Sequence, residues 1–392
     1  MDSPCSEEWY SVGADIGALE ITLALRDRFG RIHYKHFPLS DRDQLLETFQ
    51  AFECRVLPSV GSGSWRLSEI LERETGIMIE KHREPVCIWT AIEKLLKPGS
   101  GPTLPAFRFD YSLAPSAVRY PISAPYPARE SVQKLMVPVP LSDLSDSFPI
   151  LLVIVKTGTS FYRMDSPSDF VRVGGSSIGA STLMALGNAL VARDSVEGIT
   201  QRATALEEHS VTDLLVEDIY GGDCDSIGLP GSIIASCLGK ASAESTDSAD
   251  LAKSLTDLMS INTAQLANLH ARLHKCKTAV VVGALTEEMC ECMQRVLHIL
   301  SKNSSEVLKA VFFKDSKYLG CLGALLRRER LISELSGRNT DVVVSTATVA
   351  DGLDDETYTK LRICTPPVSV VHAPVSTLQP PVSPAHPHVS FI

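Results

Sequence analysis

The sequence predicts a mixed α/β protein of two lobes that face each other across a cleft. Apolar and polar residues alternate over two stretches, 10–37 and 149–173, and short turns interrupt each stretch, a pattern typical of β-hairpins that open a sheet. The first turn of each stretch consists largely of small residues, Asp15-Ile16-Gly17 and Thr157-Gly158-Thr159-Ser160. Helical patterns follow both hairpins, so we expect the chain to repeat one α/β unit.

Composition limits the kinds of function that the chain can have. Its 392 residues leave room for a large core, and 44% hydrophobic with 21% charged residues is ordinary for a folded soluble protein. The 37 basic and 47 acidic side chains give a formal charge of −10. We therefore expect no nucleic-acid partner and no attraction to an anionic membrane surface.

The lack of a recognisable targeting signal and the pattern of cysteines predict a cytoplasmic protein with reduced cysteines. No apolar run approaches the ~20 residues that span a bilayer, and residues 1–8 lack the basic start and apolar centre of a signal peptide. The ten cysteines include no C-x-x-C pair, and Cys290 and Cys292 fall in a helical pattern with no histidine cluster nearby. We expect the cysteines to act as small apolar residues, and neither a zinc site nor a disulfide framework.

The expected N-terminal lobe covers residues 1–96. Strands are predicted over 10–17, 21–26 and 31–37, a helix begins near Ser40, and further helical patterns run over 65–72 and 88–96. Residues 97–148 are rich in Pro, Ser and Tyr, which excludes a continuous helix and predicts an insertion or flap.

The expected C-terminal lobe covers residues 149–336. Its predicted elements are strands over 149–156, 161–164 and 170–173, a loop over 174–179, a helix over 181–192, helical patterns over 195–274 with a break at 220–223, strands over 278–283 and 310–313, and helices from about 286 and over 320–335. Residues 337–392 are rich in Pro, Val, Ser and Thr without a sustained period, which predicts a disordered tail.

Four blocks in order resemble the eukaryotic (type II) pantothenate kinases. They are Val211–Asp223 with Gly228–Gly231 and Ile234–Gly239, close to "DIYGGDY…GL…ASSFG"; Arg172–Thr182, close to "RVxGTSLGGGT"; Val280–Gly283, close to "VFVGN"; and Tyr318–Leu325, close to "YxGAxGAL". The resemblance covers roughly residues 9–335. It implies the actin/Hsp70/sugar-kinase-like (ASKHA) fold, a dimer, and transfer of phosphate from ATP to pantothenate, the first step of coenzyme A synthesis.

The resemblance places the nucleotide contacts but also shows losses among them. The family's first turn reads D-I-G-G-T-x-x-K, and this chain keeps Asp15 and Gly17 while Ala18, Leu19 and Thr22 replace the second glycine, the threonine and the lysine. A lysine beside a phosphate contributes on the order of 4 kcal/mol at an effective dielectric of 20, so its loss predicts weak binding of ATP and Mg²⁺. The remaining positions implied for nucleotide binding are Ser177, Gly179, Gly283 and Gly320, with Ala180 and Ser181 in place of two family glycines.

The position of the family's general base is also altered. That base is the glutamate that ends "GGGAYKFE", and the matching stretch here, Gly61 to Ser68, ends in a serine. A serine hydroxyl does not accept a proton at neutral pH. Glu69 is adjacent, but one residue along a helix turns the side chain by about 100°, so Glu69 replaces the base only after a register shift.

The substrate positions are better preserved. By resemblance to the serines of "GSGVS" and the arginine of "YKRV", pantothenate is held by Thr157, Ser160 and Arg172, and a guanidinium fork suits its carboxylate. In the family dimer, the other subunit completes this pocket. The residues implied for that wall are Ile219, Tyr220 and Ala235, with Cys224 replacing a tyrosine.

These residues are compatible with two functions. The chain is either an active homodimeric kinase with an altered phosphate loop, or a catalytically degenerate subunit that pairs with an intact kinase and lines that partner's pocket. Losses at Ala18, Leu19, Thr22 and Ser68 beside retained dimer and substrate blocks favour the second. An Hsp70-like nucleotide switch is a remote third, and the residues leave open whether acyl-CoA binds.

Overall fold

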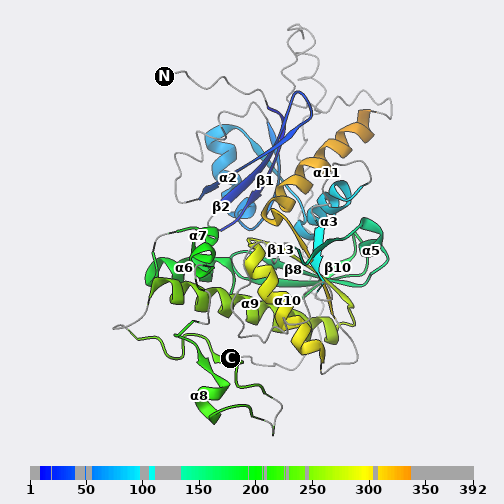
Figure 1. Cartoon of the computed structure of the whole chain (residues 1–392). Coiled ribbons are helices and arrows are strands. Elements are labelled where there is room, and N and C mark those ends of the chain that lie inside the picture. The colour runs from blue at the N-terminus through cyan, green and yellow to red at the C-terminus, as the bar shows by residue number, and fades with distance from the viewer. Residues whose placement is uncertain are drawn as a thin grey trace, which may run out of the picture.

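Two β-sheets form the centres of two lobes (Figure 1). The computed structural model describes residues 9–18, 20–39, 49, 55–97, 106–110, 134–192, 194–204, 206, 210–224, 226, 229–242, 247–302 and 308–336. Within these residues, the first sheet has the order β3 (Ile32–Pro38), β2 (Glu20–Asp27), β1 (Trp9–Ile16), β4 (Val56–Val60) and β5 (Met78–Lys81). The second has the order β10 (Phe170–Ser176), β9 (Thr159–Met164), β8 (Ile150–Val155), β13 (Thr278–Gly283), β14 (Lys309–Phe313), β6 (Ala106–Phe109) and β7 (Met136–Pro138).

The two sheets share one connectivity. In the first, β1 pairs antiparallel with β2, β2 antiparallel with β3, and β4 and β5 add parallel strands on the other side of β1. In the second, β8, β9 and β10 repeat the antiparallel meander, and β13 and β14 repeat the parallel pair. The predicted duplicated, two-lobed ASKHA-like α/β fold is therefore confirmed.

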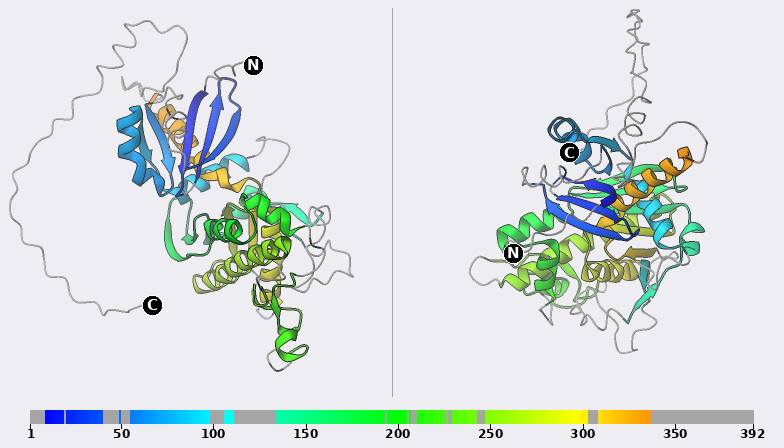
Figure 2. Two further views of the ribbon diagram at one scale, coloured as in Figure 1. Left: turned by 90° about the vertical axis from the view of Figure 1, so that its left-hand side faces the viewer. Right: turned by 90° about the horizontal axis from the view of Figure 1, so that it is seen from above.

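Two helices lie between the sheets, α3 (Glu84–Leu95) and α11 (Leu319–Ser336). Their apolar side chains share one core cluster with Leu152, Ile154 and Val280 of the second sheet. On the first sheet, α11 approaches β1 so closely that a β-carbon at Gly13 would lie 2.6 Å from the backbone nitrogen of Leu325. Figure 2 shows the two lobes and the helices between them from two further sides. The ends of β1 and β8 are thereby held on facing sides of one cleft.

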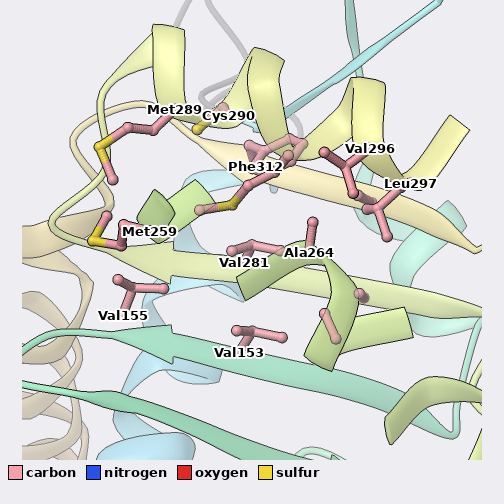
Figure 3. Packing of buried hydrophobic residues seen from close by; sticks show 14 of the residues in the cluster. Val153, Val155, Met259, Ala264, Val281, Met289, Cys290, Val296, Leu297 and Phe312 are labelled. Carbon is pink, nitrogen blue, oxygen red and sulfur yellow. The ribbon is translucent and has the colours of Figure 1, made fainter. Parts of the chain in front are cut away.

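The outer faces of the sheets carry the other helices. Because side chains alternate between the faces of a strand, β1 and β2 direct a second set of apolar residues toward α2 (Gly63–Thr75). The outer face of the second sheet is covered by α6 (Ala180–Leu190), α7 (Val196–Ala203), α9 (Ser248–Leu273) and α10 (Glu287–Lys302). Figure 3 shows Val153, Val281 and Phe312 of this sheet packed with Met259 of α9 and Cys290 of α10. In the described part of the chain, no helix combines the length and apolar character that a bilayer span needs.

Helical patterns are expected over 195–274 with a break at 220–223, but the non-helical part is longer than that break. After α7, the described residues of 210–242 form an arm in which β11 (Leu214–Leu215) pairs with β12 (Ile234–Ser236) around the short α8 (Val216–Tyr220). Gly221 ends α8 with a left-handed φ of 81°, and Pro230 with neighbouring glycines prevents a further helix. The glycines at 174 and 175, which we expected in a loop, continue β10.

The predicted insertion contributes to the second sheet at both its ends. β6 pairs with β14 and β7 with β6, and α5 (Leu141–Ser145) leads into β8. Residues 111–133 lie outside the described residues, as do the helix start expected near Ser40 and the tail from 337 onward.

A charged cluster joins β5 to α11 and predicts a pH dependence of stability. Glu80 contacts the Arg328 guanidinium and lies 3.0 Å from His82 Nε2. The neighbouring His82, with Arg328, outweighs burial and holds the pKa of Glu80 below its ordinary value of 4.5. A carboxyl whose pKa is lowered by folding stabilises the protein above that ordinary value, and this contribution is lost as the pH falls below it.

Glu80→Gln is therefore expected to lower the free energy of unfolding by about 1–2 kcal/mol at pH 7.5 and by much less at pH 3.5. Urea unfolding at both pH values measures this. Glu334→Gln, which removes an exposed ion pair with Arg330 on α11, serves as the control and should change stability by less than about 0.5 kcal/mol. Equal losses at both pH values for Glu80→Gln would contradict the electrostatic explanation.

Candidate functional site

Two cavities lie near the ends of the strands: one is lined by residues of both lobes, and the other by residues of the second lobe. The smaller, about 250 Å³, lies between the two hairpins and is lined by Asp15, Gly17, Lys156 and Thr157, among others. The larger, about 670 Å³, lies beside Gly283 at the end of β13. Glu197 and Lys317 line both, and the Lys317 ammonium lies 2.7 Å from a Glu197 oxygen. This ion pair therefore forms part of the wall of both cavities.

Asp15 is fixed at the base of the smaller cavity. It lies in β1 beside the end of β4 and is 3% exposed. Its carboxylate is enclosed by two glycines: a β-carbon at Gly61 would lie 2.7 Å from Asp15 Oδ1, and one at Gly320 would overlap Asp15 Oδ2. Gly320 thus serves here as a packing glycine around Asp15.

The structure brings Lys156 to Asp15, a partnership that the sequence did not reveal. Lys156 follows β8, and its ammonium contacts one oxygen of Asp15 and one of Glu84 at the start of α3. Burial raises the pKa of Asp15 to about 6 against the attraction of Lys156. Burial also opposes the charge on Lys156, but Asp15 and Glu84 outweigh it and raise the pKa of the ammonium. At neutral pH the three groups form a charged bridge.

The sequence does indicate that position 156 differs from the family pattern. Lys156 ends the apolar run of β8, and it stands where the "GSGVS" stretch begins with a glycine. A charged residue in place of a glycine at a small-residue turn changes what that turn can bind. The lysine absent from the first hairpin is therefore matched by an added lysine in the second.

The substrate positions lie together on the second hairpin. Ser160 and Tyr162 lie two residues apart on β9 and so on the same face of the sheet, and Arg172 of β10 pairs in register with Tyr162. Burial, together with the charge of Glu84, raises the pKa of Tyr162. Thr157 is exposed in the turn and lines the smaller cavity.

The loop before α6 packs tightly on the second hairpin. A β-carbon at Gly179 would lie 2.6 Å from Gly158, and the Ala180 amide donates to the Lys156 carbonyl at 2.7 Å. Ser177 is exposed beside this contact. At the next strand, Gly283 lines the larger cavity, and its amide donates to Ser316 Oγ at 3.1 Å. These contacts fix the ends of β8 and β13 around the two cavities.

Ser68 and Glu69 lie apart from these groups. Both are on α2, where Ser68 Oγ donates to the Trp65 carbonyl at 3.3 Å and Glu69 is exposed. Neither lines either of the two cavities. Among the described residues, Glu84 is instead the carboxylate that, with Asp15, contacts Lys156.

The arm residues lie on another part of the molecule. Ile219 and Tyr220 of α8 are 53% and 58% exposed, and Ala235 of β12 is also exposed. Figures 1 and 2 show the arm extending past α9, away from the first sheet. The chain therefore does not bring these three residues to its own Thr157, Ser160 and Arg172.

Comparison with known proteins identifies the family. A family model described as Fumble matches residues 16–327. The chain belongs to the Fumble family. This is the family of type II pantothenate kinases, so the resemblance found in the sequence is confirmed.

The named relatives match this chain over only part of their own length. A mouse protein named 4'-phosphopantetheine phosphatase is 27% identical over 288 residues, 73% of this chain and 32% of its own length. Pantothenate kinase 1 of Arabidopsis thaliana is 28% identical over 278 residues, 68% of this chain and 64% of its own. Pantothenate kinase of Schizosaccharomyces pombe is 31% identical over 187 residues, 46% of each chain. The Fumble chain thus spans less than two thirds of each of these relatives.

Solved structures with a similar course of the chain are distant in sequence. The activator of 2-hydroxyisocaproyl-CoA dehydratase from Clostridium difficile, with bound ADPNP, aligns with a TM-score of 0.44 and 10% identity, covering 85% of this chain and 98% of its own. A ROK family glucokinase from Streptomyces griseus, with glucose and AMPPNP, aligns with a TM-score of 0.39 and 14% identity, covering 81% and 99%.

Proposed function

We propose that this Fumble-family chain is a degenerate subunit of a pantothenate kinase, which transfers phosphate from ATP to pantothenate as the first step of coenzyme A synthesis. Its own site is impaired, and it acts beside an intact kinase subunit. The observation that carries the proposal is the exposed arm. Ile219 and Tyr220 are exposed on α8, and the arm extends past α9 away from the first sheet, which supports a role for both residues in the pocket of another subunit.

The chain's own cleft supports the impairment. The general-base position holds Ser68, which lies on α2 outside the cavities. Asp15, the acidic group kept from the phosphate loop, is engaged by Lys156. The groups that should bind pantothenate, Ser160 and Arg172, lie on the paired strands β9 and β10, where Ser160 is opposite Gly175 and Arg172 is opposite Tyr162. These positions support a site that keeps substrate binding and has lost proton removal.

An active homodimer is the second candidate, and Glu84 favours it. Its carboxylate reaches the Lys156 ammonium beside the substrate strand β9 and is 22% exposed. Glu84 could therefore accept the proton of the pantothenate hydroxyl in place of the missing glutamate. In that case Glu84→Gln would abolish turnover by the isolated chain.

Co-expression separates the two candidates. The purified chain alone is expected to phosphorylate pantothenate at least about 100-fold more slowly than a complex with an intact family member from the same source, since loss of a general base costs 10²–10⁴-fold. Ser68→Glu alone should leave the isolated chain at that level, because α2 does not present residue 68 to the cavity.

The subunit composition supplies the control. Native mass spectrometry of the complex should show two kinds of subunit, and turnover should fall when Tyr220→Ala is introduced only into this chain. Turnover by the isolated homodimer as fast as that of an intact kinase would overturn the degenerate-subunit proposal.

A further inference from the structure

The ATP chemistry of the proposed function implies a divalent cation beside the phosphates, and the donors present can be tested for it. Asp15 lines the smaller cavity, and Lys156 joins its carboxylate to that of Glu84 at the start of α3. Cations such as Mg²⁺ prefer oxygen ligands, so a carboxylate pair of this kind would attract one. Among the described residues, however, no group of three or more His, Cys, Asp or Glu side chains could hold a metal.

The space between the two carboxylates is already taken. The Lys156 ammonium contacts Asp15 Oδ2 and Glu84 Oε1 together. The Asp15 side chain is 4% exposed and that of Lys156 is 28% exposed, so water reaches the lysine more readily than the aspartate. A divalent cation would have to displace an ion-paired ammonium to reach either oxygen. The residues present do not fit the cation.

We propose that Lys156 is a built-in replacement for the divalent cation of this cleft. Its single positive charge bridges Asp15 in the first lobe to Glu84 at the start of α3, and the protein therefore binds no Mg²⁺ between these two carboxylates. The inference rests on the proposed function only for the expectation of a cation; the bridge itself is a feature of the structure.

The backbone positions Lys156 for this task. Its amide donates to the Gly158 carbonyl at 2.8 Å, and its carbonyl accepts from the Ala180 amide at 2.7 Å. Both neighbours are immobilised, because Gly158 packs against Gly179 and β8 pairs with β13 along its length. The side chain therefore begins from a fixed point directly opposite Asp15.

A second lysine lines the same cavity but cannot do the same. The Lys317 ammonium pairs with Glu197 at 2.7 Å, and both residues line both cavities. Lys317 thus pairs with one carboxylate, whereas Lys156 contacts two carboxylates and offsets part of their combined negative charge. This difference makes Lys317 the matched control for Lys156.

Mn²⁺ binding, followed by electron paramagnetic resonance on the full chain without nucleotide, tests the proposal. Lys156→Ala frees both carboxylates and is expected to bind one Mn²⁺ at least about tenfold more tightly than any site in the unsubstituted chain. The gain should vanish in Lys156→Ala with Asp15→Asn, and Lys317→Ala should show no gain. Lys156→Met, which keeps the aliphatic stem, provides a second variant if the alanine variant folds poorly.

The unsubstituted chain gives a decisive measurement of its own. If it binds a Mn²⁺ that Asp15→Asn removes, or if the folded Lys156 variants gain no site, the proposal is wrong. Neither result depends on turnover or on a partner subunit. Failure of this inference is therefore distinguishable from failure of the proposed function, which the kinase assay decides.

Discussion

Asp213→Ala is expected to release the arm from α9 and to lower the free energy of unfolding by about 3–5 kcal/mol. Asp213 is 1% exposed at the base of the arm, where its Oδ1 accepts hydrogen bonds from the Leu238 amide at 2.9 Å and from Ser254 Oγ of α9. Alanine would leave the Leu238 amide without this acceptor and would leave Ser254 Oγ with only the hydroxyls of Ser210 and Thr212. Burial raises the pKa of Asp213 against these hydrogen bonds, so a polar neutral residue should replace it better than an apolar one.

The surrounding contacts explain why this one residue matters. The Val211 amide donates to Asp250 Oδ1 at 2.8 Å, and the hydroxyls of Thr212 and Ser254 lie 2.6 Å apart. The Lys240 amide donates a hydrogen bond to the Thr212 carbonyl at 2.8 Å. Both ends of the arm are therefore tied to one buried polar group of residues, and Asp213 joins them. Loss of Asp213 should loosen both ends at once.

Urea unfolding and limited proteolysis measure this expectation. In Asp213→Ala, cleavage should appear within 210–242, and binding to the intact kinase subunit should be lost because Ile219 and Tyr220 are no longer positioned. Asp213→Asn should cost about 1 kcal/mol. Asp223→Ala removes the exposed acceptor of the Gly231 amide at the far end of the arm and should leave the anchor intact. An unchanged urea midpoint for Asp213→Ala would refute the anchoring role.

The lobes could be predicted from the sequence because their signals are local. Alternation along 10–37 and 149–173 placed β1 to β3 and β8 to β10 close to their observed bounds, since each strand directs one set of side chains to a buried face. The arm could not be predicted, because the apolar spacing of Val211 to Tyr220 also fits a helix. The outcome depends on glycines and Pro230 further along the chain.

Part of the site could be predicted because its residues belong to local sequence patterns. Motif positions such as Asp15, Thr157 and Gly283 lie at strand ends, and the structure brings them to the cleft. The bridge through Lys156 joins residues 15, 84 and 156, which no local pattern connects. Its formation depends on the packing of α3 between the sheets, and that packing is a property of the whole fold.

Gly283→Ala is expected to be the most damaging single-methyl change in the cleft. Gly283 ends β13 with a φ of 123°, a conformation that side-chain-bearing residues rarely adopt. A β-carbon there would overlap the Val155 carbonyl oxygen and lie 2.7 Å from the carbonyl carbon, and that carbonyl accepts from the Ala284 amide at 2.9 Å. Strain and overlap together should cost about 3–5 kcal/mol or prevent folding.

Gly76→Ala separates the two causes. Gly76 caps α2 with a φ of 72° and has open space where the β-carbon would stand, so it carries the backbone strain without the overlap. Its replacement should cost about 1 kcal/mol. The difference between the two urea midpoints therefore measures the packing of β13 against β8. Equal costs at both glycines would show that the close approach of these strand ends is not needed. Because Val155 precedes Lys156, we also expect a folded Gly283→Ala chain to gain the Mn²⁺ site of the Lys156 variants.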